Sequence, residues 1–505
     1  MSIKQLAVVG AGTMGRSIAY LFAMHQIQVV LYNRKEETLK SAATYIAEDL
    51  KRRESKGKIT QQEAEQIQSK IQYTTRMETL ANSDIVIESI AEDESLKADI
   101  LAAIEQNVST DCIIATNTSS LSLNKLSAAL KHKVRFIGLH FFNPAHIMKL
   151  VEIIPSFFSS PATTQACQAL LDQVDKRSVI CQATPGFIVN RMARPFYLEG
   201  FRLLEEGVAT AQQIDKALKA GGQFRMGPLE LTDFIGQDVN YEVSRQIWKA
   251  MQFDARYTPG HLQLSLVDAG LLGRKNGHSY FQSASDEERS DSLAAKAFTA
   301  PVSIQISGQH AFADYLKTML TTRSDAIRIE HTEAQGPALI CVNESFVISV
   351  TDGRTAESLA RVHGMDTFVI DWALDYSVSD YLVAAHNKGV RAEHRELFLM
   401  LMQYLFPKVV LIKDSPALIV ARVLCSLIHE SILMTESGIC TRQDIELASV
   451  DGVNYAKGIF TWLQWLGEGP VIQTLSQMAA LLNTSRYTPH YSYLHFAPLS
   501  AAMAS

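Results

Sequence analysis

The feature that most constrains the fold is a glycine-rich turn near the amino terminus. The stretch IKQLAVVGAGTMGRSIAYLFAMHQIQVVLYNR reads as a strand, a turn, a helix and a second strand. Gly10, Gly12 and Gly15 have the spacing G-x-G-x-x-G, which permits a tight turn, close approach of a pyrophosphate and close packing of helix on strand. Thr13 and Met14 open the helix, whose amino terminus attracts phosphate. The pattern predicts a dinucleotide-binding domain of the Rossmann type.

The end of the second strand departs from the usual pattern of such a domain. An acidic residue normally binds the ribose 2′-hydroxyl there, whereas this strand ends in Asn33 and Arg34. Without a carboxylate the contact to the 2′-hydroxyl weakens, and repulsion of a 2′-phosphate is also absent. Arg34 is then either a phosphate ligand or a solvated cation. We expect NAD as the cofactor, with NADP possible.

The remainder of the first 185 residues alternates between predicted strands and helices, which is typical of a largely parallel sheet. Polar clusters follow three of these strands, with the sequences AEDESLK, NTSSLS and HFFNP. Ligand-binding groups of such sheets gather at the carboxyl ends of the strands. Each cluster by itself is compatible with a capped turn, but three together favour a functional site.

A histidine and a glutamate stand out in the stretch GLHFFNPAHIMKLVEIIP. His140 ends one predicted apolar strand, and Glu152 lies among aliphatic residues in the next. An unpaired carboxylate in such surroundings is costly, so Glu152 requires a partner. His140 is the candidate, although a histidine at this position is also compatible with a core residue.

Composition and charge exclude several classes of protein. The chain has 505 residues, a net charge of -6 and a pI near 6.2, which argues against nucleic acid as the main partner. Its six cysteines are scattered without a CxxC pair, which favours reduced thiols over disulfides or a metal site. There is no apolar run of membrane-spanning length and no leader sequence. We expect a cytoplasmic protein without a membrane or a metal ion.

After residue 185 the sequence changes to predicted amphipathic helices. The last part of the chain repeats this helical segment. We predict a dinucleotide-binding domain at 1–185, a helical substrate and assembly domain at 186–284, a degenerate α/β module at 285–410 and a second helical copy at 411–505. The segment DSPALIVARVLCSLIHE aligns with ATPGFIVNRMARPFYLE, so that Pro416 matches Pro185. Asn190, an amide that needs hydrogen bonds if it is buried, matches Ala421. We therefore expect the second copy to be structural.

Six motifs resemble, in order and spacing, those of the 3-hydroxyacyl-CoA dehydrogenase family: GAGTMG, ESIAEDESLK, ATNTSSLS, GLHFFNPAHIMKLVEII, PGFIVNRMARPFY and GRKNGHSYF. The resemblance covers residues 1 to about 283. It implies that His140 is the catalytic base, that Glu152 orients it, and that Ser119 and Asn190 hold the substrate oxygens. It also implies that Lys56 meets the CoA tail and that the cofactor lies near Glu92, Lys97, Asn117 and Asn143.

The reaction implied by this resemblance is reversible oxidation of an (S)-3-hydroxyacyl-CoA to the 3-ketoacyl-CoA. A long chain with a degenerate second half resembles the phenylacetate-degradation branch, which acts on 3-hydroxyadipyl-CoA. The alternatives are a 3-hydroxybutyryl-CoA dehydrogenase of short-chain fatty-acid metabolism, a β-hydroxyacid dehydrogenase of similar architecture, and a non-enzymatic crystallin-like or nucleotide-binding relative. The second helical copy predicts either a dimer or a pseudo-dimeric monomer.

Overall fold

The computed structural model describes residues 3–281, 301–321 and 327–492, so the predicted boundary at residue 284 lies outside the described residues. The chain forms two compact units. The first contains residues 1–191 and 434–454, and the second contains residues 192–433 and 455–505. A segment of the second helical copy therefore belongs to the unit that holds the glycine-rich turn.

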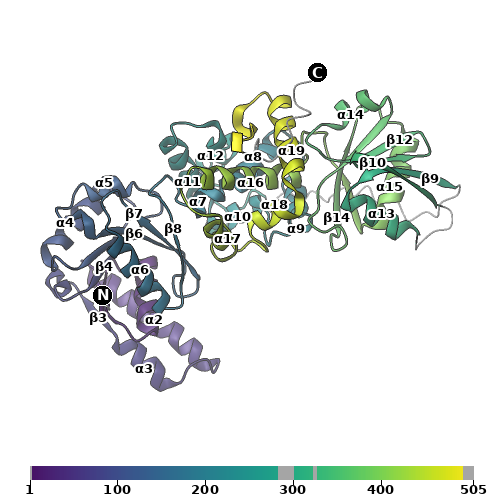
Figure 1. The fold of residues 1–505 in the computed structure, drawn as a ribbon. Helices are drawn as coiled ribbons and strands as arrows, with labels where there is room; N and C mark the ends of the chain where they lie inside the picture. The colour runs from purple at the N-terminus through teal and green to yellow at the C-terminus, as the bar shows by residue number, and fades with distance from the viewer. Residues whose placement is uncertain (1–2, 282–300, 322–326, 493–505) are drawn as a thin grey trace. The chain divides into compact units, whose positions relative to one another are not determined.

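The first unit is built on an eight-stranded sheet with the order β3-β2-β1-β4-β5-β6-β7-β8 (Figure 1). Neighbouring strands are parallel, except that β6 and β7 run antiparallel. The central strands β4, β5 and β6 are buried along their whole length, which explains their continuous apolar sequences. The strands are β1 (Gln5–Val9), β2 (Gln28–Tyr32), β3 (Ile71–Thr74), β4 (Ile85–Glu88), β5 (Ile113–Thr116), β6 (Phe136–Phe141), β7 (Leu150–Pro155) and β8 (Arg177–Ile180).

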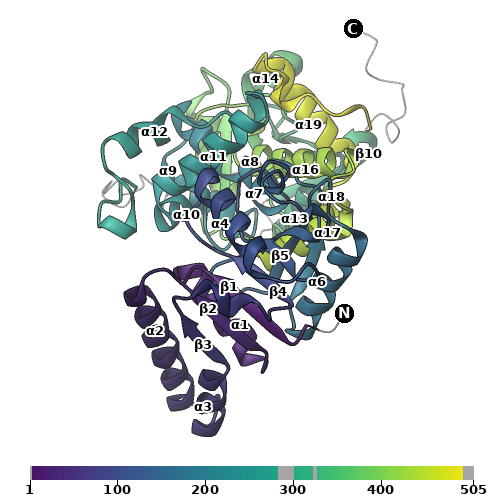
Figure 2. The same cartoon turned by 90° about the vertical axis from the view of Figure 1, so that its left-hand side faces the viewer.

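Helices connect these strands, and two of them form a hairpin. Figure 2 shows α2 and α3 side by side, joined by a turn at Gly57. A capping box at Thr60 begins α3. The helices of the first unit, with α7 at its boundary, are α1 (Thr13–Met24), α2 (Glu36–Ser55), α3 (Gln61–Ser69), α4 (Glu94–Asn107), α5 (Leu123–Ser127), α6 (Pro161–Gln173), α7 (Val189–Met192) and α17 (Arg442–Leu447).

The second unit combines both helical copies with a second sheet. Its helices from the two copies are α8 (Arg194–Glu205), α9 (Ala211–Ala220), α10 (Pro228–Ile235), α11 (Gln237–Ala250), α12 (His261–Asp268), α16 (Val420–Glu436), α18 (Ile459–Leu466) and α19 (Glu468–Leu481). The helices that accompany the second sheet are α13 (Ala311–Thr321), α14 (Ala356–His363) and α15 (Ala392–Leu405). The predicted fold class is confirmed: a Rossmann-type domain, a helical domain, and a second α/β and helical repeat.

The second sheet has seven strands in the order β10-β9-β11-β12-β13-β14-β15. From β12 to β15 the neighbours are parallel, antiparallel and parallel, which repeats the pattern from β5 to β8. The degenerate module thus retains one half of the first sheet. Its strands are β9 (Val302–Gln309), β10 (Ile327–Pro337), β11 (Leu339–Val342), β12 (Phe346–Val350), β13 (Asp366–Ile370), β14 (Tyr381–His386) and β15 (Lys408–Leu411).

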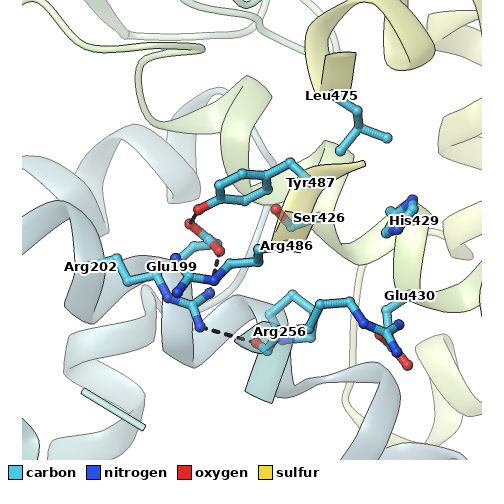
Figure 3. Close-up of a pocket in the computed structure, with 10 residues that line it drawn as sticks. Glu199, Arg202, Arg256, Ser426, His429, Glu430, Leu475, Arg486 and Tyr487 are labelled. Carbon is cyan, nitrogen blue, oxygen red and sulfur yellow. Dashed lines mark hydrogen bonds and ion pairs between the residues drawn. The ribbon is translucent and has the colours of Figure 1, made fainter. Parts of the chain in front are cut away.

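A buried polar network joins the two helical copies inside the second unit (Figure 3). Tyr487 donates its hydroxyl to Glu199 Oε2 at 2.9 Å, and Tyr257 donates to Glu430 Oε1 at 2.5 Å. Glu199 and Glu430 occupy matched positions of the repeat, as do the two tyrosines in ARY and SRY. Each copy therefore supplies a tyrosine to the glutamate of the other, which is the reciprocity of a two-fold interface between identical partners.

Candidate functional site

The glycine-rich turn has the geometry of a phosphate cradle. Gly10 has φ of +106°, and a Cβ atom there would lie 2.4 Å from the Ser89 carbonyl oxygen. A Cβ on Gly15 would lie 1.7 Å from the carbonyl oxygen of Gly10, so α1 packs directly on the turn. A Cβ on Gly12 would instead meet nothing within 4 Å. Open space thus faces the start of α1, whose first turn carries no acidic residue, and these features fit a bound pyrophosphate.

The residues at the end of β2 lie beside this turn. Asn33 Oδ1 accepts the N–H of Ala11 at 3.4 Å, and its Nδ2 donates to the Lys35 carbonyl at 3.1 Å. Asn33 is half-buried and Arg34 is exposed. The side chain at the position expected to meet the ribose is therefore neutral and already holds the glycine turn, with a cation next to it.

His140 and Glu152 form a direct pair on neighbouring antiparallel strands. The register of β6 and β7 places them opposite each other, and His140 Nδ1 lies 2.5 Å from Glu152 Oε2. Glu152 is fully buried, and His140 is 7% exposed. The imidazole is flanked by the rings of Phe142 and Phe187, with centroids at 4.6 and 5.9 Å. With a neutral imidazole beside an ionised carboxylate, which only accepts hydrogen bonds, Nδ1 carries the proton and Nε2 keeps a lone pair.

The other oxygen of Glu152 holds the backbone where the helical domain begins. Glu152 Oε1 accepts the N–H groups of Ile188 and Val189 at 2.8 and 2.9 Å. These are among the first N–H groups of a helix, which lack partners within the helix itself. The carboxylate thereby fixes α7 and the residue that follows Val189, namely Asn190.

Asn190 and Ser119 lie close together in the structure, and Glu92 joins them. Asn190 Nδ2 donates to the Ser119 carbonyl at 3.4 Å. Glu92 Oε1 accepts from the Thr118 hydroxyl at 2.6 Å, and from the Ser119 N–H and hydroxyl at 2.8 and 3.1 Å. Burial alone would raise the pKa of Glu92, but Lys97 and these hydrogen bonds outweigh it and hold the pKa below its usual value. Glu92 thus organises the loop that presents Ser119.

Lys97 is buried in an ion pair that sequence reasoning missed. Its Nζ lies 2.8 Å from Glu88 Oε1 and 3.5 Å from Glu92 Oε2. Glu88 also accepts from the Thr116 hydroxyl at 2.5 Å, and both Lys97 and Glu88 are fully buried. The signal was present in the sequence DIVIE, where one acidic residue ends an apolar strand.

The remaining predicted residues lie in different surroundings. Asn117 Oδ1 accepts the N–H of Phe141 at 2.9 Å, so it ties β5 to the end of β6. Asn143 is exposed just beyond β6. Lys56 is exposed at the end of α2, next to the turn of the hairpin. None of the hydrogen bonds given for the described residues joins Lys56 or Asn143 to the His140 pair.

The second copy supplies an internal comparison for this site. Strands β8 and β15 each end five residues before the matched prolines of the repeat, so their pairings align the two sheets. On this alignment Val383 corresponds to Glu152. Asp371, whose N–H donates to the Val383 carbonyl at 2.9 Å, corresponds to His140.

Asp371 makes the backbone contacts in the second copy that Glu152 makes in the first. Its carboxylate accepts the N–H groups of Ile419, Val420 and Ala421 at 2.9, 2.7 and 3.1 Å. Burial raises its pKa to about 6 despite these bonds. The second copy keeps a carboxylate that holds the start of a helix, but it has neither the imidazole nor the amide.

The arrangement in the first unit is suited to moving a proton beside a bound dinucleotide. An imidazole with a free Nε2 and a buried carboxylate on Nδ1 is a general base whose cation is stabilised as it forms. In the described part of the chain, no group of three or more His, Cys, Asp or Glu side chains is placed to hold a metal ion. None of the described helices is long and apolar enough to cross a bilayer.

Three family models match the chain. The NAD-binding domain of 3-hydroxyacyl-CoA dehydrogenase matches residues 5–184. The C-terminal domain of the same family matches twice, at residues 186–283 and 418–499. Between these two matches, residues 348–416 match the reduced Rossmann-fold domain of 3-hydroxybutyryl-CoA dehydrogenase. The double match agrees with the internal repeat.

Individual relatives fall into a long and a short group. A 3-hydroxyadipyl-CoA dehydrogenase from Escherichia coli K12 is 33% identical over 97% of this chain and 96% of its own length. The crystal structure of a 3-hydroxybutyryl-CoA dehydrogenase from E. coli K12 covers 98% of both chains with a TM-score of 0.85 and 31% identity. A 3-hydroxybutyryl-CoA dehydrogenase from Mycobacterium tuberculosis is 34% identical, covering 98% of that protein but 55% of this chain. Short relatives thus lack the second half.

Proposed function

This chain belongs to the 3-hydroxyacyl-CoA dehydrogenase family, and from that premise we propose that His140, Glu152, Ser119 and Asn190 form its catalytic site. The reaction is reversible oxidation of a 3-hydroxyacyl-CoA to the 3-ketoacyl-CoA, with an NAD-type cofactor as the hydride acceptor. The observation that carries the assignment is the 2.5 Å contact between His140 Nδ1 and Glu152 Oε2, because it leaves Nε2 free to take a proton.

In the oxidative direction, His140 Nε2 removes the proton from the 3-hydroxyl group. A nicotinamide cofactor, when bound at the glycine turn, would supply the acceptor for the hydride of C3. The imidazolium formed on His140 is stabilised by Glu152, whose second oxygen is held by two backbone N–H groups. Reduction reverses these steps, so that His140 donates its proton to the 3-keto oxygen.

Ser119 and Asn190 hold the oxygen of the substrate in this proposal. The Ser119 hydroxyl donates to Glu92 in the structure, so its lone pairs are available to a substrate hydroxyl. Asn190 is the second residue of α7, and Glu152 accepts the N–H of the first, Val189. Movement of the β7 carboxylate would therefore disturb both the base and the amide.

The cofactor site is proposed to accept NAD and to tolerate NADP. The glycine cradle fits a pyrophosphate, and the family match is to an NAD-binding domain. The ribose end carries the neutral Asn33 and the exposed Arg34, so a 2′-phosphate would meet no negative charge there. Glu92, Lys97, Asn117 and Asn143 are proposed to line the nicotinamide half, and Lys56 the CoA tail.

The proposed substrate is 3-hydroxyadipyl-CoA, and the alternative is 3-hydroxybutyryl-CoA. Support for the dicarboxylic substrate comes from the E. coli relative of that name, which matches over nearly the whole chain. The E. coli crystal structure that also matches over the whole chain has the four-carbon substrate in its name. The acyl chain is therefore the part of the proposal that most needs a measurement.

The test compares the two acyl chains and the two cofactors with one protein preparation. Initial rates are measured with 3-hydroxyadipyl-CoA and 3-hydroxybutyryl-CoA, each with NAD and NADP, for the unmodified protein, His140→Gln and His386→Gln. The last variant is a matched control, because His386 is a half-buried histidine of the second sheet. We expect loss of turnover only in His140→Gln and the higher kcat/KM for the adipyl substrate. Absence of turnover with both acyl chains would overturn the assignment.

We also propose that the chain is organised as a pseudo-dimer, with domains at 1–185, 186–284, 285–410 and 411–505. The family matches and the reciprocal tyrosine–glutamate contacts support this organisation. Light scattering coupled to size exclusion should then give the mass of one chain, 56.0 kDa. A stable mass of two chains would contradict it.

A further inference from the structure

A segment of the second helical copy is built into the unit that holds the His140 pair. Residues 434–454, here called the brace, contain the end of α16, helix α17 and the turn Ala448–Gly452. Helix α17 packs against β8, the edge strand of the first sheet. These residues come from the half of the chain to which the short M. tuberculosis relative has no match.

The brace is bonded to the edge of the sheet at both ends of β8. The N–H of Gln182 donates to the Ile439 carbonyl at 3.0 Å, and its side-chain amide donates to the Gly438 carbonyl at 2.8 Å. At the other end, Arg177 lies 3.0 Å from Asp451. The strand beside β7, which carries Glu152, is thus held by the second half of the chain.

The turn at the end of the brace lies against one residue of β7 and one residue at the start of α7. A Cβ atom on Gly452 would lie 2.8 Å from Leu150 Cδ2 and 3.0 Å from Val189 Cγ2. Leu150 begins β7, two residues before Glu152, and Val189 donates its N–H to that carboxylate. Leu150 and Val189 are both buried. Gly452 therefore packs at the place where β7, which carries Glu152, meets the start of α7.

Two of these contacts recur with the copies exchanged. In the second unit, a Cβ on Gly221, which matches Gly452, would lie 3.1 Å from Val420 Cγ2. The N–H of Lys413, which matches Gln182, donates to the Val208 carbonyl at 3.1 Å. There the carboxylate held between strand and helix is Asp371, which has no histidine partner. The first unit alone couples this packing to a proton-transferring pair.

We propose that the brace is a positioning element for catalysis: it holds β7 and the start of α7 so that the Glu152 carboxylate stays in line with His140 Nδ1. This inference rests on the proposed role of the His140–Glu152 pair. It assigns to the second half of the chain a function beyond joining the two copies. The chemistry stays with the first copy, and the second copy sets its geometry.

The test uses the full-length chain with Gly452→Val and, as a matched control, Gly221→Val. A side chain at position 452 would crowd Leu150 and Val189, and one at position 221 would crowd the Trp372 carbonyl oxygen and Val420, so both substitutions should lower Tm. Gly452→Val should lower kcat by tenfold to about a hundredfold, the scale of a misplacement near 1 Å, with KM for acyl-CoA within about twofold. Gly221→Val should leave kcat within about twofold of the unmodified protein.

Gly452→Ala in a Glu152→Gln background keeps the proposal open to refutation if the valine variant does not fold. If the brace acts through Glu152, the alanine lowers kcat in the unmodified chain and has no further effect in that background. Equal effects in both backgrounds, or equal kcat for Gly452→Val and Gly221→Val, would overturn the proposal. A protein in which Glu152→Gln itself has full activity would instead overturn the proposed function.

Discussion

Replacement of Glu152 by glutamine is the most informative single change in this chain. The glutamine oxygen can still accept the N–H groups of Ile188 and Val189, at 2.8 and 2.9 Å in the structure, so the start of α7 is retained. The new amide group, however, faces His140 Nδ1, which lies 2.5 Å from the present carboxylate oxygen. Because an amide NH2 donates, Nδ1 must become an acceptor and Nε2 must carry the proton. The base is then in the wrong tautomer.

The magnitude follows from two contributions. An imidazolium and a carboxylate whose charges are about 4 Å apart attract each other by about 4 kcal/mol at an effective dielectric constant near 20, which corresponds to about 10³ in rate. The wrong tautomer in a comparable histidine–carboxylate pair of another enzyme class costs about 10⁴ in kcat. We therefore expect Glu152→Gln to lower kcat by about 10³ to 10⁴, with KM for acyl-CoA within about twofold.

The assay is reduction of the 3-ketoacyl-CoA followed by NADH absorbance, with circular dichroism to verify folding. Asp371→Asn is the matched control, because Asp371 holds a helix start in the same way but faces no histidine. Its kcat should stay within about twofold of the unmodified protein. A loss below tenfold in a folded Glu152→Gln protein would refute the reasoning.

Three further outcomes are expected. Burial raises the pKa of Asp371 from 3.8 to about 6. The contribution of Asp371 to the free energy of unfolding is therefore full below pH 3.8 and decreases by about 3 kcal/mol as pH rises to 6. Urea unfolding at pH 4 and pH 7 measures this decrease, which should be absent in Asp371→Asn. Arg422→Met should destabilise folding by about 3 kcal/mol, measured by the same method, because buried Arg422 bonds to Glu199 and Glu206 at 2.7 Å. Asn33→Asp should lower kcat/KM for NADPH relative to NADH at least about tenfold, since a carboxylate repels the 2′-phosphate; an unchanged ratio would show that this position does not contact the ribose.

Several members of the proposed site could be identified in the sequence because they follow local rules. A tight strand-to-helix turn requires Gly10 and Gly15, and both lie within six consecutive residues of the sequence. Glu152 is an acidic residue in an apolar run and therefore required a partner. His140 was the candidate because it lies in the adjacent strand, which a short connection joins to that of Glu152. Asn190 was identifiable as an amide among apolar neighbours in FIVNR, which needs hydrogen bonds if it is buried.

Other parts of the site depended on contacts between distant segments. Glu92 stays predicted at the cofactor, but its contact with the loop of Ser119 was not foreseen, because it depends on the parallel pairing of β4 and β5. The residue opposite Lys97 in its buried ion pair, Glu88, was not singled out, since a lone acidic residue at a strand end has many possible roles. Pairing of this kind depends on which side chains burial leaves without water.

The sequence by itself determined the fold class, the repeat and the chemical identity of the His140–Glu152 pair, because short-range patterns of glycine, apolar and polar residues specify them. The tertiary structure decided which half of the chain supports that pair. Gly452 and Val189 are far apart in the sequence and meet only after both copies have folded. The correspondence between Asp371 and His140 becomes visible only when the two sheets are aligned. Packing across such distances depends on the register and twist of whole elements, which no local pattern contains.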